Sequence, residues 1–172
     1  VFNVGQTSLG YAQTWEVREA ISELRDAGKT TVSVLSSPDF KGTYLASASE
    51  HVWLLPTSPY DPAGVGITLE SYQGTLEKIG VKAEFLRIGD YKSAPEAYTY
   101  PEPSKESLEQ TQAYLDTIYT NVIGSVAADR ELRERDVERA VEDVPLFPED
   151  AIGRGFVDNV VYIDKQIGRA HV

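Results

Sequence analysis

Two short strands that enclose a helix of small residues place the strongest constraint on the fold of this chain. Residues 30–35 are rich in β-branched side chains and predict a strand, which a turn at residues 36–39 follows. Residues 41–48 predict a short helix whose small side chains allow close packing, and residues 51–55 predict a second strand. This order predicts a βαβ unit, in which a right-handed crossover joins two parallel strands.

The rest of the chain continues the alternation of strands and helices. An apolar face over residues 17–27 predicts a helix that covers a sheet and ends at Gly28. Residues 69–79 predict another amphipathic helix, and residues 81–88 predict a buried strand. A long helix is predicted over residues 104–128, long enough to pack against a partner subunit as well as its own sheet. The pattern therefore predicts an α/β fold.

Two stretches near the C-terminal end complete this prediction. Residues 130–143 alternate arginines with glutamates, which is typical of a solvated helical face rather than a binding site. Residues 149–152 predict a helical turn, and residues 155–161 a loop that enters a final strand.

Composition restricts the partners and the chemistry. The 172 residues amount to about one domain, and the net charge of −11 argues against binding to nucleic acid because no basic cluster offsets it. The chain contains no cysteine, so neither a disulfide framework nor a thiolate nucleophile is available. Its two histidines cannot build a histidine-rich metal site.

Several features suggest that the sequence is part of a longer protein. Methionine is absent, so we expect a processed product or a fragment. No apolar run approaches the roughly 20 residues that span a bilayer, and any anchor or targeting signal is expected upstream. Residues 167–172 resemble the translation of a sequencing adapter, so the native part is expected to be residues 1–166.

Lys92 is the candidate active residue. It follows the predicted strand and Gly89, and sheet proteins often place chemistry just past a strand end. A lysine acts as a base only when burial among apolar groups lowers the pKa of its ammonium, because an ordinary lysine, with a pKa of about 10.4, is protonated at neutral pH. Five neighbours could supply that setting: Tyr91, Ala94, Pro95, Ala97 and Tyr98. Local composition alone nevertheless favours an ordinary solvated lysine.

Residues 89–98 resemble a known motif. The run Gly-Asp-Tyr-Lys-Ser-Ala-Pro-Glu-Ala-Tyr is similar to the Gly-x-Tyr-Lys-Ser-Ala-x-Glu-Pro-Phe motif of the signal peptide peptidase A family, serine peptidases with a Ser/Lys dyad. Further similar segments occur in the family's order from Glu16 to Asp158. The resemblance implies a ClpP/crotonase-like fold of repeated ββα units, with Lys92 as general base and Ser93 as its hydrogen-bonding support.

The same resemblance implies the surroundings of the reaction. It implies a hydrophobic peptide substrate, such as a released signal peptide, and a homo-oligomer that requires no cofactor and no metal. It also implies association with a membrane on its extracytoplasmic (periplasmic) side.

The family's nucleophile is missing from its expected position. Single-domain members carry the serine in a Ser-Gly-Gly-Tyr motif at the start of the small-residue helix, where this chain has Lys41-Gly42-Thr43-Tyr44. In double-length members the N-terminal half keeps the lysine and the C-terminal half supplies the serine. The resemblance therefore implies that residues 1–166 form a lysine-bearing half-domain that is inactive alone.

Two other functions stay open. The missing serine also suits a non-catalytic assembly or peptide-binding module of the same fold. Acyl-CoA chemistry of the crotonase type rests on fold analogy alone.

Overall fold

The computed structural model describes residues 1–162, so the predicted adapter-derived tail, 167–172, lies outside the described residues. The chain divides into two compact units, which we describe separately. The sheet unit comprises Val1–Gly64 and the described part of Tyr119–Val172, and the lysine unit comprises Val65–Ile118. The boundaries predicted for a single half-domain, 1–166, stay a prediction.

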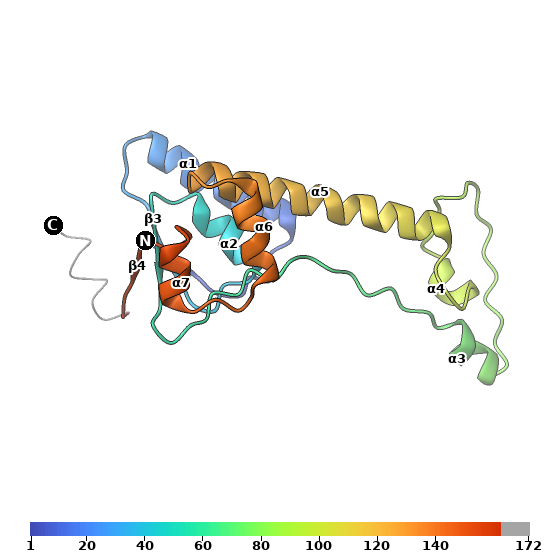
Figure 1. Cartoon of the computed structure of the whole chain (residues 1–172). Coiled ribbons are helices and arrows are strands. Elements are labelled where there is room, and N and C mark those ends of the chain that lie inside the picture. The colour runs from blue at the N-terminus through green and yellow to red at the C-terminus, as the bar shows by residue number, and fades with distance from the viewer. Residues whose placement is uncertain (163–172) are drawn as a thin grey trace. The chain divides into compact units, whose positions relative to one another are not determined.

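The elements follow one another along the chain as Figure 1 shows. In order they are β1 (Phe2–Val4), α1 (Tyr11–Asp26), β2 (Val32–Leu35), α2 (Phe40–Ser47), β3 (His51–Leu54), α3 (Gln73–Lys78), α4 (Glu96–Thr99), α5 (Lys105–Asp129), α6 (Glu134–Glu142), α7 (Pro148–Gly153) and β4 (Asn159–Val160).

The sheet unit is built on four parallel strands in the order β1-β2-β3-β4. Every residue of β2 is buried, as expected for a parallel strand with both faces covered. Val34 lies opposite Trp53 in the register, and Leu35 and Leu54, also opposite each other, are fully buried. The β2-α2-β3 segment therefore confirms the predicted βαβ unit with parallel neighbours.

Helices of the sheet unit pack their apolar side chains into this core. Phe40 at the start of α2 stacks on Tyr119 of α5, with ring centroids 5.8 Å apart. Gly28 follows α1 with φ +74°, a left-handed conformation that suits glycine and ends the helix where the sequence predicts. In α6 only Val137 and Ala140 are buried, so the charged residues of this helix form the solvated face predicted for residues 130–143.

The lysine unit has very little core of its own. Only Glu96, Ser107 and Ile118 are buried among residues 65–118. Burial of apolar surface is what offsets the conformational entropy lost on folding, of about 1–2 kcal/mol per residue for the backbone. A unit with a single buried apolar side chain therefore needs further surface to cover it.

The predicted buried strand at residues 81–88 is wrong. These residues form neither a strand nor a helix, and the side chains expected to be buried are exposed: Val81 at 46%, Phe85 at 53% and Ile88 at 86%. An extended segment becomes a strand only when a neighbour completes its backbone hydrogen bonds, and the described chain supplies no such neighbour here. The predicted helix over residues 69–79 is also shorter, since it spans only Gln73–Lys78.

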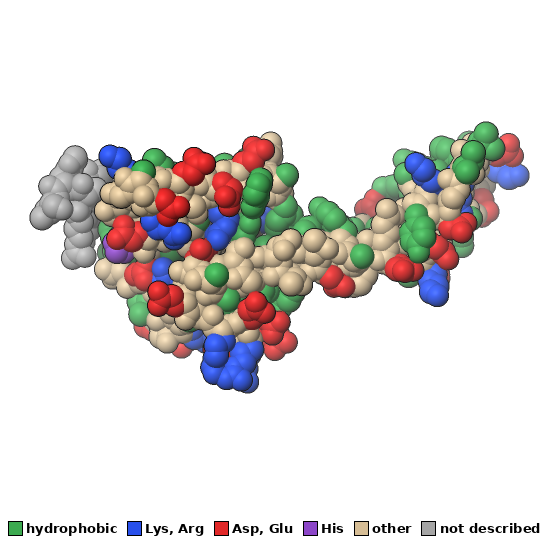
Figure 2. All heavy atoms as spheres, turned by 90° about the horizontal axis from the view of Figure 1, so that it is seen from above, with side chains coloured by type: hydrophobic (Ala, Val, Ile, Leu, Met, Phe, Trp, Pro, Cys, Tyr) green, Lys and Arg blue, Asp and Glu red, His purple; other side chains and the backbone are tan. Residues whose placement is uncertain are grey.

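Hydrophobic side chains remain on the surface of the lysine unit. Figure 2 shows them interspersed with acidic groups and a few basic ones. Among residues 1–162 no helix is both long enough and apolar enough to span a membrane.

Candidate active site

Lys92 lies in a turn rather than at the end of a strand. Gly89 begins the turn with φ +94°, a conformation that side-chain-bearing residues rarely adopt, and its carbonyl accepts a hydrogen bond from the Lys92 amide at 3.3 Å. Lys92 is exposed in the chain as described. The strand expected to end just before Lys92 is not formed, and the apolar burial expected around this residue is not formed by the described residues either.

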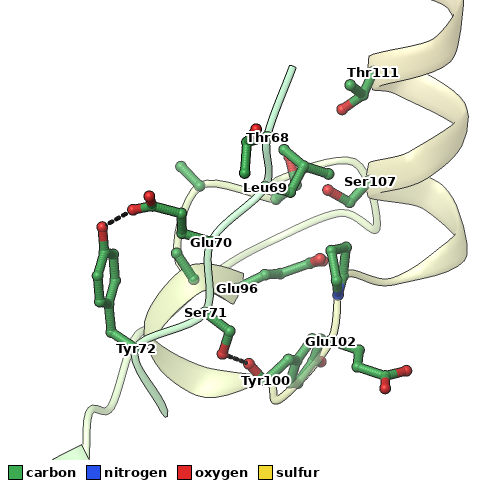
Figure 3. A pocket seen from close by; sticks show the side chains of 14 residues that line it. Thr68, Leu69, Glu70, Ser71, Tyr72, Glu96, Tyr100, Glu102, Ser107 and Thr111 are labelled. Atoms are coloured by element: carbon green, nitrogen blue, oxygen red, sulfur yellow. Dashed lines mark hydrogen bonds between the residues drawn. The ribbon is translucent and has the colours of Figure 1, made fainter. Parts of the chain in front are cut away.

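A pocket of about 360 Å³ lies in the same unit (Figure 3). Residues 68–72, one side of the 93–103 segment and the first turns of α5 line it. The extended chain at residues 68–72 is fastened there, because the Tyr72 amide donates to the Ala97 carbonyl at 2.6 Å and the Ser71 hydroxyl to the Tyr100 carbonyl at 2.5 Å. Ser93 and Ala94 of the motif thus face a formed concavity.

Ser93 makes its side-chain contact with the long helix. Its hydroxyl donates to the Gln110 side-chain carbonyl on α5 at 3.2 Å. This bond ties the residue that follows Lys92 to a rigid element. The predicted support of the lysine by Ser93 is not tested by this contact and stays a prediction.

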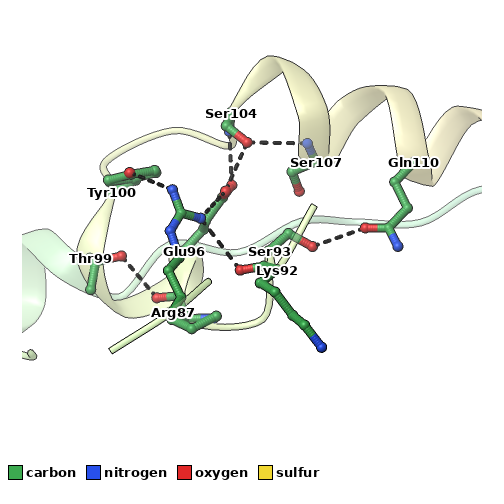
Figure 4. Close-up of polar contacts among 10 residues, drawn as sticks. Arg87, Lys92, Ser93, Glu96, Thr99, Tyr100, Ser104, Ser107 and Gln110 are labelled. Carbon is green, nitrogen blue, oxygen red and sulfur yellow. Dashed lines mark hydrogen bonds and ion pairs between the residues drawn. The ribbon is translucent and has the colours of Figure 1, made fainter. Parts of the chain in front are cut away.

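Glu96 is the centre of a polar network next to the lysine turn (Figure 4). Its side chain is 4% exposed. One carboxylate oxygen, Oε1, accepts from the Ser104 hydroxyl at 2.8 Å and from Arg87 Nη1 at 2.9 Å, and Oε2 accepts from the Ser104 amide at 3.0 Å. Both oxygens of this buried carboxylate are therefore hydrogen-bonded.

Arg87 connects this carboxylate to the turn. Its Nη2 donates to the Tyr100 hydroxyl at 2.8 Å, and its guanidinium lies 5.3 Å from the centre of the Tyr100 ring. Its Nη1 also makes a long hydrogen bond, 3.4 Å, to the Lys92 carbonyl. One arginine thereby contacts the residues on both sides of Glu96.

The network keeps Glu96 ionised. Burial by itself would raise the pKa of the Glu96 carboxyl, but the hydrogen bonds from Ser104 and Arg87 and the charge of Arg87 outweigh it, so the pKa lies below its ordinary value. On the other side of the turn, the negative charge of Glu109 raises the pKa of the Tyr91 phenol. The lysine turn therefore has two carboxylates near it, Glu96, which is ion-paired with Arg87, and the exposed Glu109.

Lys41 stands at the position where the resemblance predicts the nucleophilic serine. In the sheet unit, the Lys41 ammonium donates to the carbonyls of Thr7 and Leu9 at 3.0 and 2.8 Å. The Asp39 carboxylate caps α2 by accepting from the Gly42 amide at 2.7 Å. An amide at the start of this helix that could hold an oxyanion is therefore already bound to a carboxylate of the chain itself.

Sequence reasoning missed the network around Glu96. Glu96 belongs to the quoted motif, but no linear pattern indicates that a glutamate two residues before a tyrosine is buried. Arg87 and Ser104 lie nine and eight residues from it in sequence and lack a motif of their own. Within residues 1–162, no group of three or more His, Asp or Glu side chains is arranged to hold a metal ion.

The all-parallel sheet and its small-residue helix define an α/β protein. Its candidate site is the lysine turn, which lies next to a buried carboxylate. Residues 23–172 match Peptidase family S49, and the chain belongs to this family. The family is ClpP-like in fold, so the fold class predicted from the sequence is confirmed.

Several curated proteins are similar to the chain. "Serine protease SPPA, chloroplastic" of Arabidopsis thaliana is 26% identical over 165 residues, which cover 96% of the chain and 24% of that protein. "Protease 4" of Salmonella typhi is 28% identical over 116 residues, covering 67% of the chain and 19% of that protein. "Protease 4" of Haemophilus influenzae is 28% identical over 115 residues, with the same two shares. The chain spans a quarter or less of the length of these relatives.

Proposed function

We propose that this chain is the lysine-bearing, N-terminal half of a serine endopeptidase with a Ser/Lys dyad. Its membership in Peptidase family S49 and its similarity to proteins named serine protease and Protease 4 support a proteolytic function. Its substrates are hydrophobic peptides, such as released signal peptides. The protein works in association with a membrane, on the extracytoplasmic side.

Lys92 acts as the general base in this proposal. Its neutral amine takes the proton of a serine hydroxyl, the serine oxygen attacks the peptide carbonyl, and the ammonium returns a proton to the leaving amine. Ser93 supports the lysine, and no metal or organic cofactor takes part. The observation that carries the proposal is the Tyr-Lys-Ser-Ala turn, which holds Lys92 at an exposed position beside a formed pocket.

The serine comes from the downstream, C-terminal half of the protein. The contacts at the family's usual nucleophile position support this. The Lys41 ammonium there donates to two backbone carbonyls, and the Gly42 amide donates to the Asp39 carboxylate. A chain with this arrangement supplies the base but not the nucleophile. The chain alone is therefore inactive.

Assembly completes the site. The lysine unit buries one apolar side chain, Ile118, yet exposes Phe85, Leu86 and Ile88 close to the lysine turn. Covering these side chains with the C-terminal half and with further copies of the protein in a homo-oligomer would remove water from around Lys92. Removal of water is what a lysine base requires, since desolvation disfavours its charged form.

Replacement of Lys92 tests this function. In the native protein that contains this chain, we expect Lys92→Ala to lower kcat for cleavage of an apolar peptide ester by about 10²–10⁴-fold, the usual contribution of a general base. Lys82→Ala is the matched control, because Lys82 is an exposed lysine of the same unit whose partner is the exposed Glu84. The chain alone should not cleave the ester, and addition of the C-terminal half should restore cleavage. Full activity of Lys92→Ala would overturn the proposed role.

A second candidate function is a non-catalytic assembly or peptide-binding module. It is favoured by the absence of a serine at residues 41–44. Binding and cleavage measurements separate the two functions. A binding module would bind an apolar peptide at equilibrium without cleaving it, and Lys92→Ala would leave its affinity unchanged.

A further inference from the structure

Glu96 is an unusual residue to find buried in the lysine unit. That unit buries three residues in all, and one of them is a carboxylate with a 4% exposed side chain. Removing a charge from water costs several kcal/mol unless hydrogen bonds and an opposite charge compensate it. A unit with so little apolar core would not be expected to bury a carboxylate for stability alone.

The contacts of Glu96 close the segment that carries Lys92. Its two carboxylate oxygens bind Arg87, which precedes Lys92, and Ser104, which follows it. Glu96 itself lies between them at the start of α4, so the three residues hold the 87–104 segment as a closed loop. The Ser104 hydroxyl also accepts from the Ser107 amide, and this contact anchors the loop to the first turn of α5.

The same network reaches Lys92 through its backbone. Arg87 Nη1 is shared between the Glu96 carboxylate and the Lys92 carbonyl, while Figure 4 shows the lysine side chain pointing away from these contacts. The loop is thereby held at the Lys92 main chain, and the ammonium projects outward.

We propose that Glu96, acting through Arg87 and Ser104, is a positioning residue for Lys92. This inference rests on the proposed role of Lys92 as the base. Proton transfer requires donor and acceptor at hydrogen-bonding distance, and a displacement of about 1 Å can cost about 10²-fold in rate. A clamp on the Lys92 backbone is suited to fixing that distance.

Glu96→Gln in the native protein tests the inference by kinetics. The substitution keeps the shape of the side chain but removes its charge, so it weakens the bond to Arg87 and turns an amide group toward the Ser104 donors. We expect kcat for an apolar peptide ester to fall about 10–100-fold with KM changed less than about twofold, because the base is misplaced while the binding surface is retained. Glu84→Gln is the matched control, since Glu84 is an exposed glutamate of the same unit that is also paired with a cation.

A milder change separates positioning from folding. Tyr100→Phe removes only the hydroxyl that accepts from Arg87 and keeps the ring beneath the guanidinium. We expect a smaller fall in kcat, about 2–5-fold, again at unchanged KM. A higher KM with unchanged kcat in either variant would overturn the inference.

Hydrogen exchange in the chain itself provides a readout that does not depend on activity. In Glu96→Gln the amides of Tyr100 and Ser104 should exchange at least about tenfold faster, whereas those of Val34 and Val52 in the sheet unit should be unchanged. Unchanged exchange at Tyr100 and Ser104 would refute the clamp. Faster exchange with a normal kcat, in a protein that Lys92→Ala inactivates, would refute positioning but leave the proposed function standing. An active Lys92→Ala protein would instead refute the proposed function.

Discussion

Arg18 of α1 forms an ion pair with Asp129, the last residue of α5, across a sequence separation of 111 residues. The two side chains are 8% and 12% exposed. Arg18 also donates to the Tyr44 carbonyl at 2.8 Å and to the Ser47 hydroxyl at 2.9 Å, and Ser47 in turn donates to Asp129 at 2.8 Å. This buried cluster joins α1, α2 and α5 within the sheet unit.

Asp129→Asn should therefore destabilise the chain. Breaking a buried pair leaves an uncompensated charge on Arg18, and we expect the free energy of unfolding in urea to fall by about 3 kcal/mol. Asp143→Asn is the control, because Asp143 pairs with Arg154 on the surface and should cost less than about 1 kcal/mol. Equal losses in the two variants would show that the Arg18 pair contributes no more than a surface pair.

Lys41→Ser should not create a peptidase within this chain. The substitution restores a serine at the family's nucleophile position, but the Asp39 carboxylate still holds the Gly42 amide that a developing oxyanion would need. We expect ester hydrolysis by the variant to stay at the rate of the unmodified chain, with Lys29→Ser as the control. A rate clearly above that of both would mean that this half can build its own dyad.

Alkaline pH should unfold the chain through Tyr60. This side chain is 1% exposed and stacks on Phe156, and burial raises the pKa of its phenol above the ordinary value. As the pH rises, the Tyr60 phenol therefore ionises in the unfolded chain at a pH where it is still neutral in the folded chain. Its contribution to stability is complete below about pH 10 and is lost as the pH rises above that value, at about 1.4 kcal/mol per pH unit.

Urea denaturation between pH 9 and 11 measures this effect. Tyr60→Phe should flatten the alkaline fall in stability, whereas Tyr162→Phe, at an exposed position, should leave it unchanged. An equally steep fall in Tyr60→Phe would assign the alkaline loss to other groups.

Much of the sheet unit could be predicted from local sequence. Small residues and β-branched runs around residues 30–55 predict the β2-α2-β3 segment because periodicity and turn chemistry act over a few neighbours. The apolar spacing likewise predicts a long helix over residues 104–128, which is observed at Lys105–Asp129. In the lysine unit the alternating apolar pattern predicts a strand at residues 81–88 that does not form, since strand formation depends on a partner that local sequence does not describe.

The sequence by itself determined the α/β class, the family and the motif that contains Lys92. Each of these is written in short runs of residues, such as the βαβ pattern and the Tyr-Lys-Ser-Ala motif. Only the tertiary structure decided that Glu96 is a buried carboxylate held by Arg87 and Ser104, and that Lys41 is bound to two backbone carbonyls. The reason is physical, because burial and hydrogen bonding depend on how the folded chain packs its segments together, within one loop for Glu96 and across more than 30 residues for Lys41, and no spacing along the chain records that.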